Sequence, residues 1–308
     1  KKENMKAINK GEINLAVDKE KNVGMSANNA IAENENKISI SSKKSTGMFT
    51  QNNGTITNRG NISSTGEENI GMVAKDADSE ATNEGEITVE GKSSLGMVAS
   101  ESGKVLNKKN ITTKGEHSLG MYIRENSTGE NTADGVISLL EKESVGMYAE
   151  NNGSADTAKN SGTINLGANN TTGIYLDESA YGYNYGTIKS TGSGLKKLAG
   201  VVVKNGSTIE NWGRIELTAE DSVGILSKGN AAGANPGIVK NYGTFNISGG
   251  ATKEHLPGMS DTTKKVGGVE IKVDNKVSPA TVTVTDPAGN IVTPTLVTAE
   301  QNKINAPI

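Results

Sequence analysis

Residues 118–126 read "SLGMYIREN", and this short motif occurs several times along the chain. Related stretches are "NIGMVAKDA" (69–77), "SLGMVASES" (94–102) and "SVGMYAENN" (144–152). A glycine followed by methionine or another aliphatic residue recurs in steps of 23 to 27 residues, at Gly24, Gly47, Gly71, Gly96, Gly120, Gly146, Gly173, Gly200 and Gly224. A nearly constant period of this length predicts a solenoid of stacked coils.

A second motif, N-x-G-x-I, alternates with the first. Its copies are "NKGEI" (9–13), "NRGNI" (58–62), "NEGEI" (83–87), "NSGTI" (160–164), "NYGTI" (184–188), "NWGRI" (211–215) and "NYGTF" (241–245), with degenerate copies at 34–38, 107–111 and 133–137. From the N-x-G glycine to the next Gly-Met-type glycine the distance is 11 residues in seven of nine copies. The return distance varies from 12 to 19, which is typical of turns that project from a solenoid.

The apolar residues alternate with a spacing of two, as in Ala81, Asn83, Ile87 and Val89, which is the periodicity of β-strands. Three short strands fit into each repeat. We therefore predict an all-β fold, a right-handed parallel β-helix with about 24–27 residues per coil. About ten coils over residues 1–250 would form a rod roughly 48 Å long. Five of the six prolines follow residue 250, and we expect residues 251–308 to form a β-rich subdomain or an irregular continuation.

The two motifs also predict which residues form the core. We expect the alternation Val145, Met147, Ala149 to face inward, with the preceding glycine facing outward or at a bend that needs positive φ. Methionine fills an irregular narrow core well. Stacked asparagines at an inner corner can hydrogen-bond from coil to coil. The predicted structural ladders are Met25, Met48, Met72, Met97, Met121 and Met147, and Asn58, Asn83, Asn160, Asn184, Asn211 and Asn241.

Composition argues against several classes of function. Only 33% of the residues are hydrophobic and 3% aromatic, the formal charge is −3, and the basic residues form no concentrated patch, so nucleic-acid binding is not expected. No apolar run is long enough for a membrane helix, so we expect no membrane contact. Cysteine is absent and the two histidines lie in different regions, so we predict no metal site and no cofactor. The acidic residues are scattered over turns without a convergent acid–base set, so we predict no enzymatic activity.

Two groups of tyrosines are candidates for binding. The residue after each Gly-Met pair alternates to the opposite face and would form an apolar stripe with Tyr122, Tyr148 and Tyr175 at its centre, unless lateral stacking or loops cover it. The stretch "YGYNY" (181–185) contributes Tyr181, Tyr183 and Tyr185. Inserted loops at 190–200 and 227–239 occur in the same coils, and recognition often lies on such loops.

The tandem "N-x-G-x-I … S-x-G-M-Y" coils, rich in Lys and Asn and free of cysteine, resemble passenger domains of the large fusobacterial type V autotransporter adhesins over residues 1–250. This resemblance implies secretion across the outer membrane and display on the cell surface of a Gram-negative bacterium, anchored by a C-terminal β-barrel that this chain lacks. It also implies virulence-related adhesion or coaggregation, with surface proteins or glycans of other bacterial or host cells as partners. We therefore expect the chain to be a fragment of a longer protein.

Three hypotheses follow from the sequence. The first is a non-enzymatic adhesin segment, a rod that mediates or spaces cell–cell adhesion. The second is a β-helical polysaccharide lyase or hydrolase, for which an acidic cluster with aromatic residues in one groove would be the discriminating feature. The third is a passive stalk whose binding site lies elsewhere in the full protein.

Overall fold

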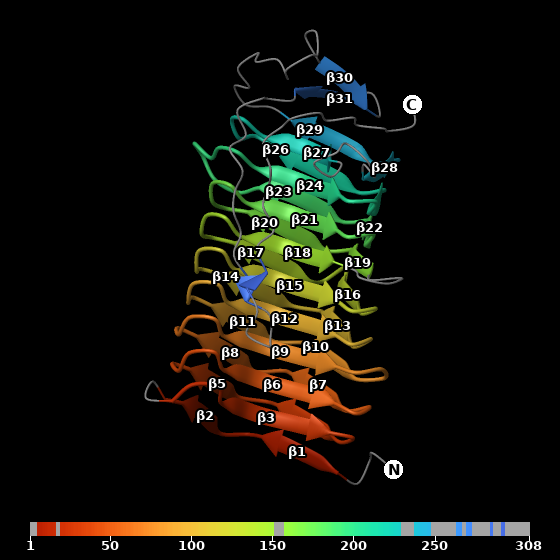
Figure 1. The fold of residues 1–308 in the computed structure, drawn as a ribbon. Coiled ribbons are helices and arrows are strands. Elements are labelled where there is room, and N and C mark those ends of the chain that lie inside the picture. The colour runs from red at the N-terminus through yellow and green to blue at the C-terminus, as the bar shows by residue number, and fades with distance from the viewer. Residues whose placement is uncertain are drawn as a thin grey trace.

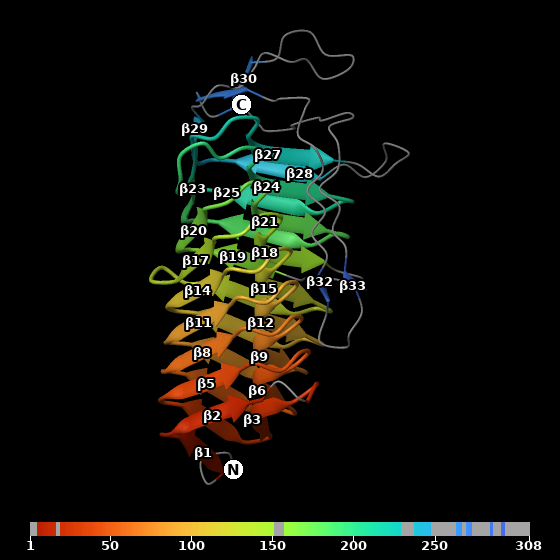
Figure 2. The ribbon, with the colours of Figure 1, turned by 90° about the vertical axis from the view of Figure 1, so that its left-hand side faces the viewer.

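The structure is a computed structural model that describes residues 5–16, 19–150, 157–228 and 237–247, together with four short strands after residue 262. The chain winds into a right-handed parallel β-helix with three sheets, of 10, 10 and 9 strands. Figures 1 and 2 show the rod from two sides, with successive coils stacked from β1 to β29. The described residues form no helix, so none there could span a membrane.

In the described residues each of the first nine coils contributes one strand to each of the three sheets, and the tenth contributes β28 and β29 to the first two. Sheet 1 consists of β1 (Lys6–Asn9), β4 (Ile31–Asn34), β7 (Thr55–Asn58), β10 (Glu80–Asn83), β13 (Lys104–Asn107), β16 (Thr128–Asn131), β19 (Thr157–Asn160), β22 (Tyr181–Asn184), β25 (Thr208–Asn211) and β28 (Ile238–Asn241). Sheet 2 consists of β2 (Glu12–Leu15), β5 (Lys37–Ile40), β8 (Asn61–Ser64), β11 (Glu86–Val89), β14 (Asn110–Thr113), β17 (Val136–Leu139), β20 (Thr163–Leu166), β23 (Thr187–Ser190), β26 (Arg214–Leu217) and β29 (Thr244–Ile247).

Sheet 3 carries the Gly-Met motif in six-residue strands. It consists of β3 (Val23–Asn28), β6 (Thr46–Gln51), β9 (Ile70–Lys75), β12 (Leu95–Ser100), β15 (Leu119–Arg124), β18 (Val145–Glu150), β21 (Thr172–Asp177), β24 (Ala199–Lys204) and β27 (Val223–Lys228). The segment from the N-x-G glycine to the next Gly-Met-type glycine, which has 11 residues in most coils, runs through sheet 2 to sheet 3. The return segment, whose length varies, runs from sheet 3 through sheet 1.

The strands pair in parallel and in register, so that equivalent residues of neighbouring coils form columns. In sheet 3, Met97 lies between Met72 and Met121. The six methionines of the predicted ladder are all buried in the core cluster, together with the inward isoleucines of sheet 2 such as Ile87 and Ile111. The core of this narrow rod is thus built from columns of like residues, each coil closing over the one before it.

The corner between sheets 1 and 2 contains a continuous asparagine ladder. The Nδ2 group of each asparagine donates a hydrogen bond to Oδ1 of the asparagine in the next coil, over distances of 2.6–2.9 Å. The ladder runs through Asn9, Asn34, Asn58, Asn83, Asn107, Asn131, Asn160, Asn184, Asn211 and Asn241. Because these amides are buried from Asn34 onward, each hydrogen bond satisfies groups that have no access to water.

One coil departs from the predicted alignment of the motif. In the degenerate copy at 133–137 the motif placed Ala133 at the asparagine position, but Asn131 occupies the ladder. The Nδ2 group of Asn131 donates to the carbonyl of Gly135, four residues on, whereas Asn83 bonds to Gly85, two residues on. Two extra residues in this turn are therefore accommodated without breaking the ladder.

The expected outward orientation of the Gly-Met glycine is wrong. A Cβ built on Gly96 would lie 2.6 Å from Cγ2 of the core residue Ile111 and 2.5 Å from the carbonyl oxygen of Gly120 in the next coil. Among the described glycines positive φ occurs only at Gly194 and Gly206. The Gly-Met glycines are thus needed for close packing of neighbouring coils, not for a left-handed backbone.

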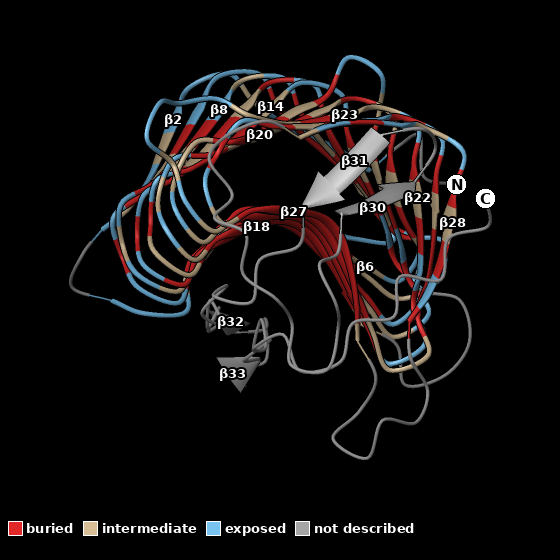
Figure 3. Ribbon diagram, turned by 90° about the horizontal axis from the view of Figure 1, so that it is seen from above, coloured by how far each residue is buried: buried red, intermediate tan, exposed pale blue. Residues whose placement is uncertain are grey.

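This glycine also interrupts the strict alternation of sheet 3. Met97 and Ala99 face the core, as predicted, but Leu95 lies on the outer face together with Val98. The same holds for Val145, which was expected inside. The outer face of sheet 3 therefore carries a second apolar cluster, which is buried as well (Figure 3). This outer cluster comprises Ile70, Val73, Leu95, Val98, Leu119, Tyr122, Val145, Tyr148, Tyr175, Ala199, Val202, Val223 and Leu226.

The expected domain boundary near residue 250 falls outside the described residues. Beyond it, β30 (Thr263–Val266) and β31 (Val269–Lys272) pair antiparallel, and β31 contacts β29, the last strand of sheet 2. The strands β32 (Val284–Thr285) and β33 (Ile291–Val292) also pair antiparallel. The division into 1–250 and 251–308 remains a prediction.

Candidate functional site

The tyrosines and the single tryptophan fall into two groups on different sheets. Tyr122, Tyr148 and Tyr175 belong to the outer cluster of sheet 3 and are at most 2% exposed. The other four tyrosines and the tryptophan lie on sheet 1 and its turns, within three successive coils. We call this group the aromatic face; it comprises Tyr181, Tyr183, Tyr185, Trp212 and Tyr242. Four of its members are 48–51% exposed, and Tyr183 is half-buried.

The asparagine ladder positions three members of the aromatic face. Tyr185, Trp212 and Tyr242 each occupy the variable position of an N-x-G turn, directly after a ladder asparagine. Their backbone N–H groups donate to the carbonyls of the ladder asparagines of the preceding coil, at 2.7, 2.8 and 2.7 Å. The side chains therefore project into solvent from a backbone that is fixed by buried hydrogen bonds.

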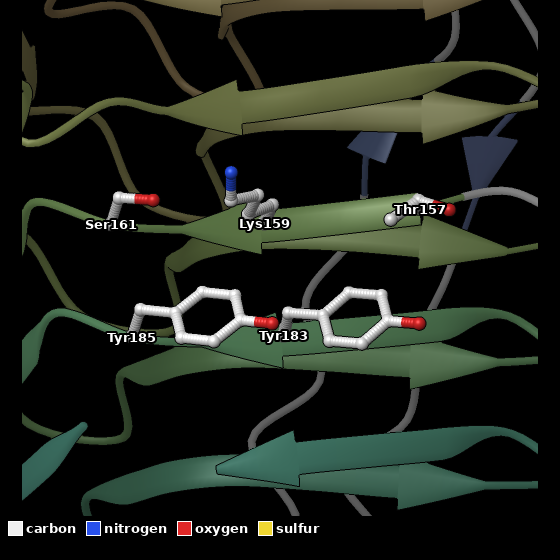
Figure 4. A pocket seen from close by; sticks show the side chains of 5 residues that line it. All are labelled: Thr157, Lys159, Ser161, Tyr183 and Tyr185. Atoms are coloured by element: carbon white, nitrogen blue, oxygen red, sulfur yellow. The ribbon is translucent and has the colours of Figure 1, made fainter. Parts of the chain in front are cut away.

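The rings adopt two different arrangements. The rings of Tyr183 and Tyr185 are nearly parallel, with an interplanar angle of 4° and centroids 6.1 Å apart. Figure 4 shows them side by side and face-on, which makes them coplanar. Trp212 and Tyr242, in contrast, lie face to face with centroids 4.0 Å apart.

A shallow depression of about 470 Å³ lies beside the coplanar pair (Figure 4). It is lined by Tyr183 and Tyr185 and, from the preceding coil, by Thr157, Lys159 and Ser161. The site thus combines two aromatic rings with hydroxyl groups and one ammonium group. This is a suitable lining for a ligand that has both apolar and polar groups.

The charged groups around the aromatic face are paired with one another. Nζ of Lys159 lies 3.0 Å from the Glu130 carboxylate and 5.8 Å from the centroid of the Tyr185 ring. Nζ of Lys240 lies 3.0 Å from the Glu210 carboxylate, and its hydrogen bond holds the pKa of that carboxyl below the ordinary value. Each cation close to the rings therefore has an anionic partner in the adjacent coil.

The prediction of a solvent-facing stripe through Tyr122, Tyr148 and Tyr175 needs correction. These tyrosines do lie on the outer face of sheet 3, but they are buried there, and burial raises the pKa of each phenol. The hydroxyls of Tyr122 and Tyr148 both donate to the carboxylate of Glu150. Side chains that are buried and hydrogen-bonded in this way stabilise the rod.

Tyr181, Tyr183 and Tyr185 lie together on the aromatic face, whereas Trp212 and Tyr242 were not predicted as site residues. The signal was present, since the variable residue of N-x-G is aromatic in three successive copies, "NYGTI", "NWGRI" and "NYGTF". Of the inserted loops, residues 229–236 lie outside the described part. In the 190–200 segment residues 191–194 are exposed, and the chain returns to the core at Leu198.

The carboxylates of Glu150 and Asp177 are the strongest candidates for acid–base chemistry in the described residues. Both oxygens of Glu150 accept tyrosine hydroxyls, and Asp177 accepts from Lys204 Nζ at 3.0 Å and Asn205 Nδ2 at 2.6 Å. Desolvation, together with these two carboxylates, raises the pKa of the adjacent Glu178 carboxyl. Within the described ranges no group of three or more His, Asp or Glu side chains is arranged to hold a metal ion.

Comparison with known families gives one match. The family described as the BigA third pectate lyase-like domain matches residues 1–186, which is more than half of the chain. Tyr181, Tyr183 and Tyr185 lie at the end of the matched region, and Trp212 and Tyr242 follow it. No curated protein and no solved structure matches the chain.

Proposed function

Because the chain belongs to the family of the BigA third pectate lyase-like domain, we propose that it is a non-enzymatic segment of a bacterial surface adhesin. In this proposal the β-helical rod stands on the surface of a Gram-negative cell as part of an autotransporter passenger domain of the fusobacterial kind. It contacts surface proteins or glycans of another bacterial or host cell.

The observation that carries the proposal is the aromatic face. The exposed tyrosine and tryptophan side chains all lie in three successive coils of one sheet, whereas the three tyrosines of the other coils are buried. Clustered exposed aromatic residues mark contact surfaces, because each supplies a large area while few torsion angles must be fixed.

The rigidity of the scaffold supports the same conclusion. Each coil is joined to its neighbours by three parallel strand pairings and by the asparagine ladder. A contact surface that is already ordered before binding loses little conformational entropy when the partner arrives. A passive stalk has no need for exposed aromatic rings on its surface, so the aromatic face favours a binding segment over a spacer.

Direct binding of the purified chain to partner cells tests this proposal. We expect saturable binding that is competed by the full-length protein. The control is a second β-helical protein of similar length that lacks exposed aromatic residues. Absence of binding by a folded chain, as judged by circular dichroism, would leave the stalk hypothesis as the better account.

A polysaccharide lyase or hydrolase remains the second candidate function. The Glu178 carboxyl favours it, because desolvation and the nearby Glu150 and Asp177 carboxylates raise its pKa, and a raised pKa is a property of carboxyls that act as general acids. Turnover of a polysaccharide by the purified chain, lost in Glu178→Gln, would establish an enzyme and overturn the adhesin proposal.

A further inference from the structure

We infer that the coplanar rings of Tyr183 and Tyr185 form a stacking platform for a neutral oligosaccharide. This inference names the ligand class of the proposed adhesin and rests on that proposed function. It is derived from the orientation of the two rings, from the polar groups beside them and from the pairing of the nearby charges.

The two rings present their flat faces to solvent. Their planes differ by only 4°, and they lie end to end along the strand instead of covering each other (Figure 4). The face of an aromatic ring carries partial negative charge. The C–H groups on one side of a pyranose ring carry partial positive charge, so the sugar ring lies flat on the aromatic ring. Two coplanar rings in a row suit two successive sugar units of an extended chain.

The preceding coil supplies polar groups beside the platform. Thr157, Lys159 and Ser161 alternate along β19 and its turn and line the same depression as the two tyrosines. A sugar ring that stacks on Tyr183 or Tyr185 has its hydroxyl groups at the ring edge, within the depression that these side chains line. A hydroxyl side chain can both donate and accept, which matches the hydroxyl groups of a sugar.

The charges point to a neutral ligand. Lys159 is paired with Glu130, and Lys240 is paired with Glu210, each at 3.0 Å. An acidic polysaccharide would have to compete with these carboxylates for the ammonium groups and would also be repelled by them. We therefore expect binding that changes little with salt, since screening weakens only interactions between charges.

The pair Trp212 and Tyr242 has a different role in this scheme. Its rings cover each other at 4.0 Å and so have less free face to offer. Stacking between adjacent coils stabilises the last part of the rod. Trp212 is the only tryptophan, and it follows Asn211, which is bonded to Asn184, the ladder asparagine that precedes Tyr185. Its fluorescence is therefore expected to report on ligand binding at the platform.

The test uses calorimetric titration of the purified chain with neutral oligosaccharides built from glucose, galactose, mannose or N-acetylglucosamine, and with oligogalacturonate as the acidic comparison. We expect at least one neutral oligosaccharide to bind, with an affinity that is nearly the same at low and high salt. The double variant Tyr183→Ala/Tyr185→Ala is expected to weaken binding about tenfold or more. Tyr183→Phe should keep most of the affinity, because the ring face is retained.

Leu140→Ala is the matched control, since Leu140 is 48% exposed and follows β17 in sheet 2, away from the platform. Binding of no neutral oligosaccharide, or unchanged binding by the folded double variant, would overturn the inference. So would salt-sensitive binding of oligogalacturonate alone.

Periodate treatment of the partner cells separates the two proposals. If the chain binds untreated and periodate-oxidised cells equally well, the adhesin proposal stands, and a protein partner replaces the glycan. If the chain binds a neutral oligosaccharide but no cells, the inference stands and the adhesin proposal fails.

Discussion

Met121→Asp is expected to lower the free energy of unfolding by about 4 kcal/mol. Met121 is fully buried between Met97 and Met147, and a carboxylate there would have neither water nor a cation as a partner. The change should show as a lower denaturant midpoint in circular dichroism. Because each coil of a solenoid contacts only its neighbours, the loss is expected to spread from the coils around residue 121.

Met121→Leu is the control for this prediction. Leucine keeps the volume and the apolar character of the side chain and should cost less than about 1.5 kcal/mol. A midpoint for Met121→Asp that equals the wild-type value would show that the methionine column does not face the core.

Asn107→Leu is expected to cost about 3 kcal/mol, although leucine has nearly the size of asparagine. The change removes the bond from Asn83 Nδ2 to Asn107 Oδ1, at 2.9 Å, and the bond from Asn107 Nδ2 to Asn131 Oδ1, at 2.8 Å. It also leaves the Lys109 carbonyl without the Asn107 amide, which lies 3.0 Å away. Buried polar groups that lose their partners cost about 1–3 kcal/mol each.

The neighbouring turn residue supplies the control for the ladder. Lys108→Ala removes an exposed ion pair with Glu84 at 3.2 Å, which should be worth less than about 1 kcal/mol. If Asn107→Leu and Lys108→Ala unfold at the same denaturant concentration, the ladder does not contribute to stability as described here.

The fold could be predicted from the sequence because the same residue recurs at the same position of each coil. The spacing of Gly-Met and N-x-G set the coil length, and the alternation around Ile87 and Val89 identified the strands. The location of Asn131 could not be obtained this way, since a two-residue insertion displaced the motif.

The orientation of Leu95 and Val145 was wrong for a physical reason. Simple alternation assumes a regular strand, but the glycine that follows each of these residues packs against the next coil and shifts the alternation by one position. The sequence shows the glycine and not this shift. A residue column that is predicted to face outward can therefore still be buried, as Tyr148 is.

The candidate site was only partly predictable. The cluster Tyr181, Tyr183 and Tyr185 is visible in the sequence, whereas Trp212 and Tyr242 join it only when the coils are stacked in register. The coplanar arrangement of Tyr183 and Tyr185 depends on side-chain torsions that no sequence pattern specifies.

The central claim is that the aromatic face is the contact surface of this rod. It is tested most directly by comparing partner-cell binding by the wild-type chain and by the triple variant Tyr183→Ala/Tyr185→Ala/Trp212→Ala. Tyr185 and Trp212 are exposed and Tyr183 is half-buried, so the variant is expected to stay folded, with a loss of about 1 kcal/mol from the Trp212–Tyr242 stacking. We predict that the folded variant binds at least about tenfold more weakly than the wild type. Equal binding by the two proteins would contradict the account and place the contact surface elsewhere.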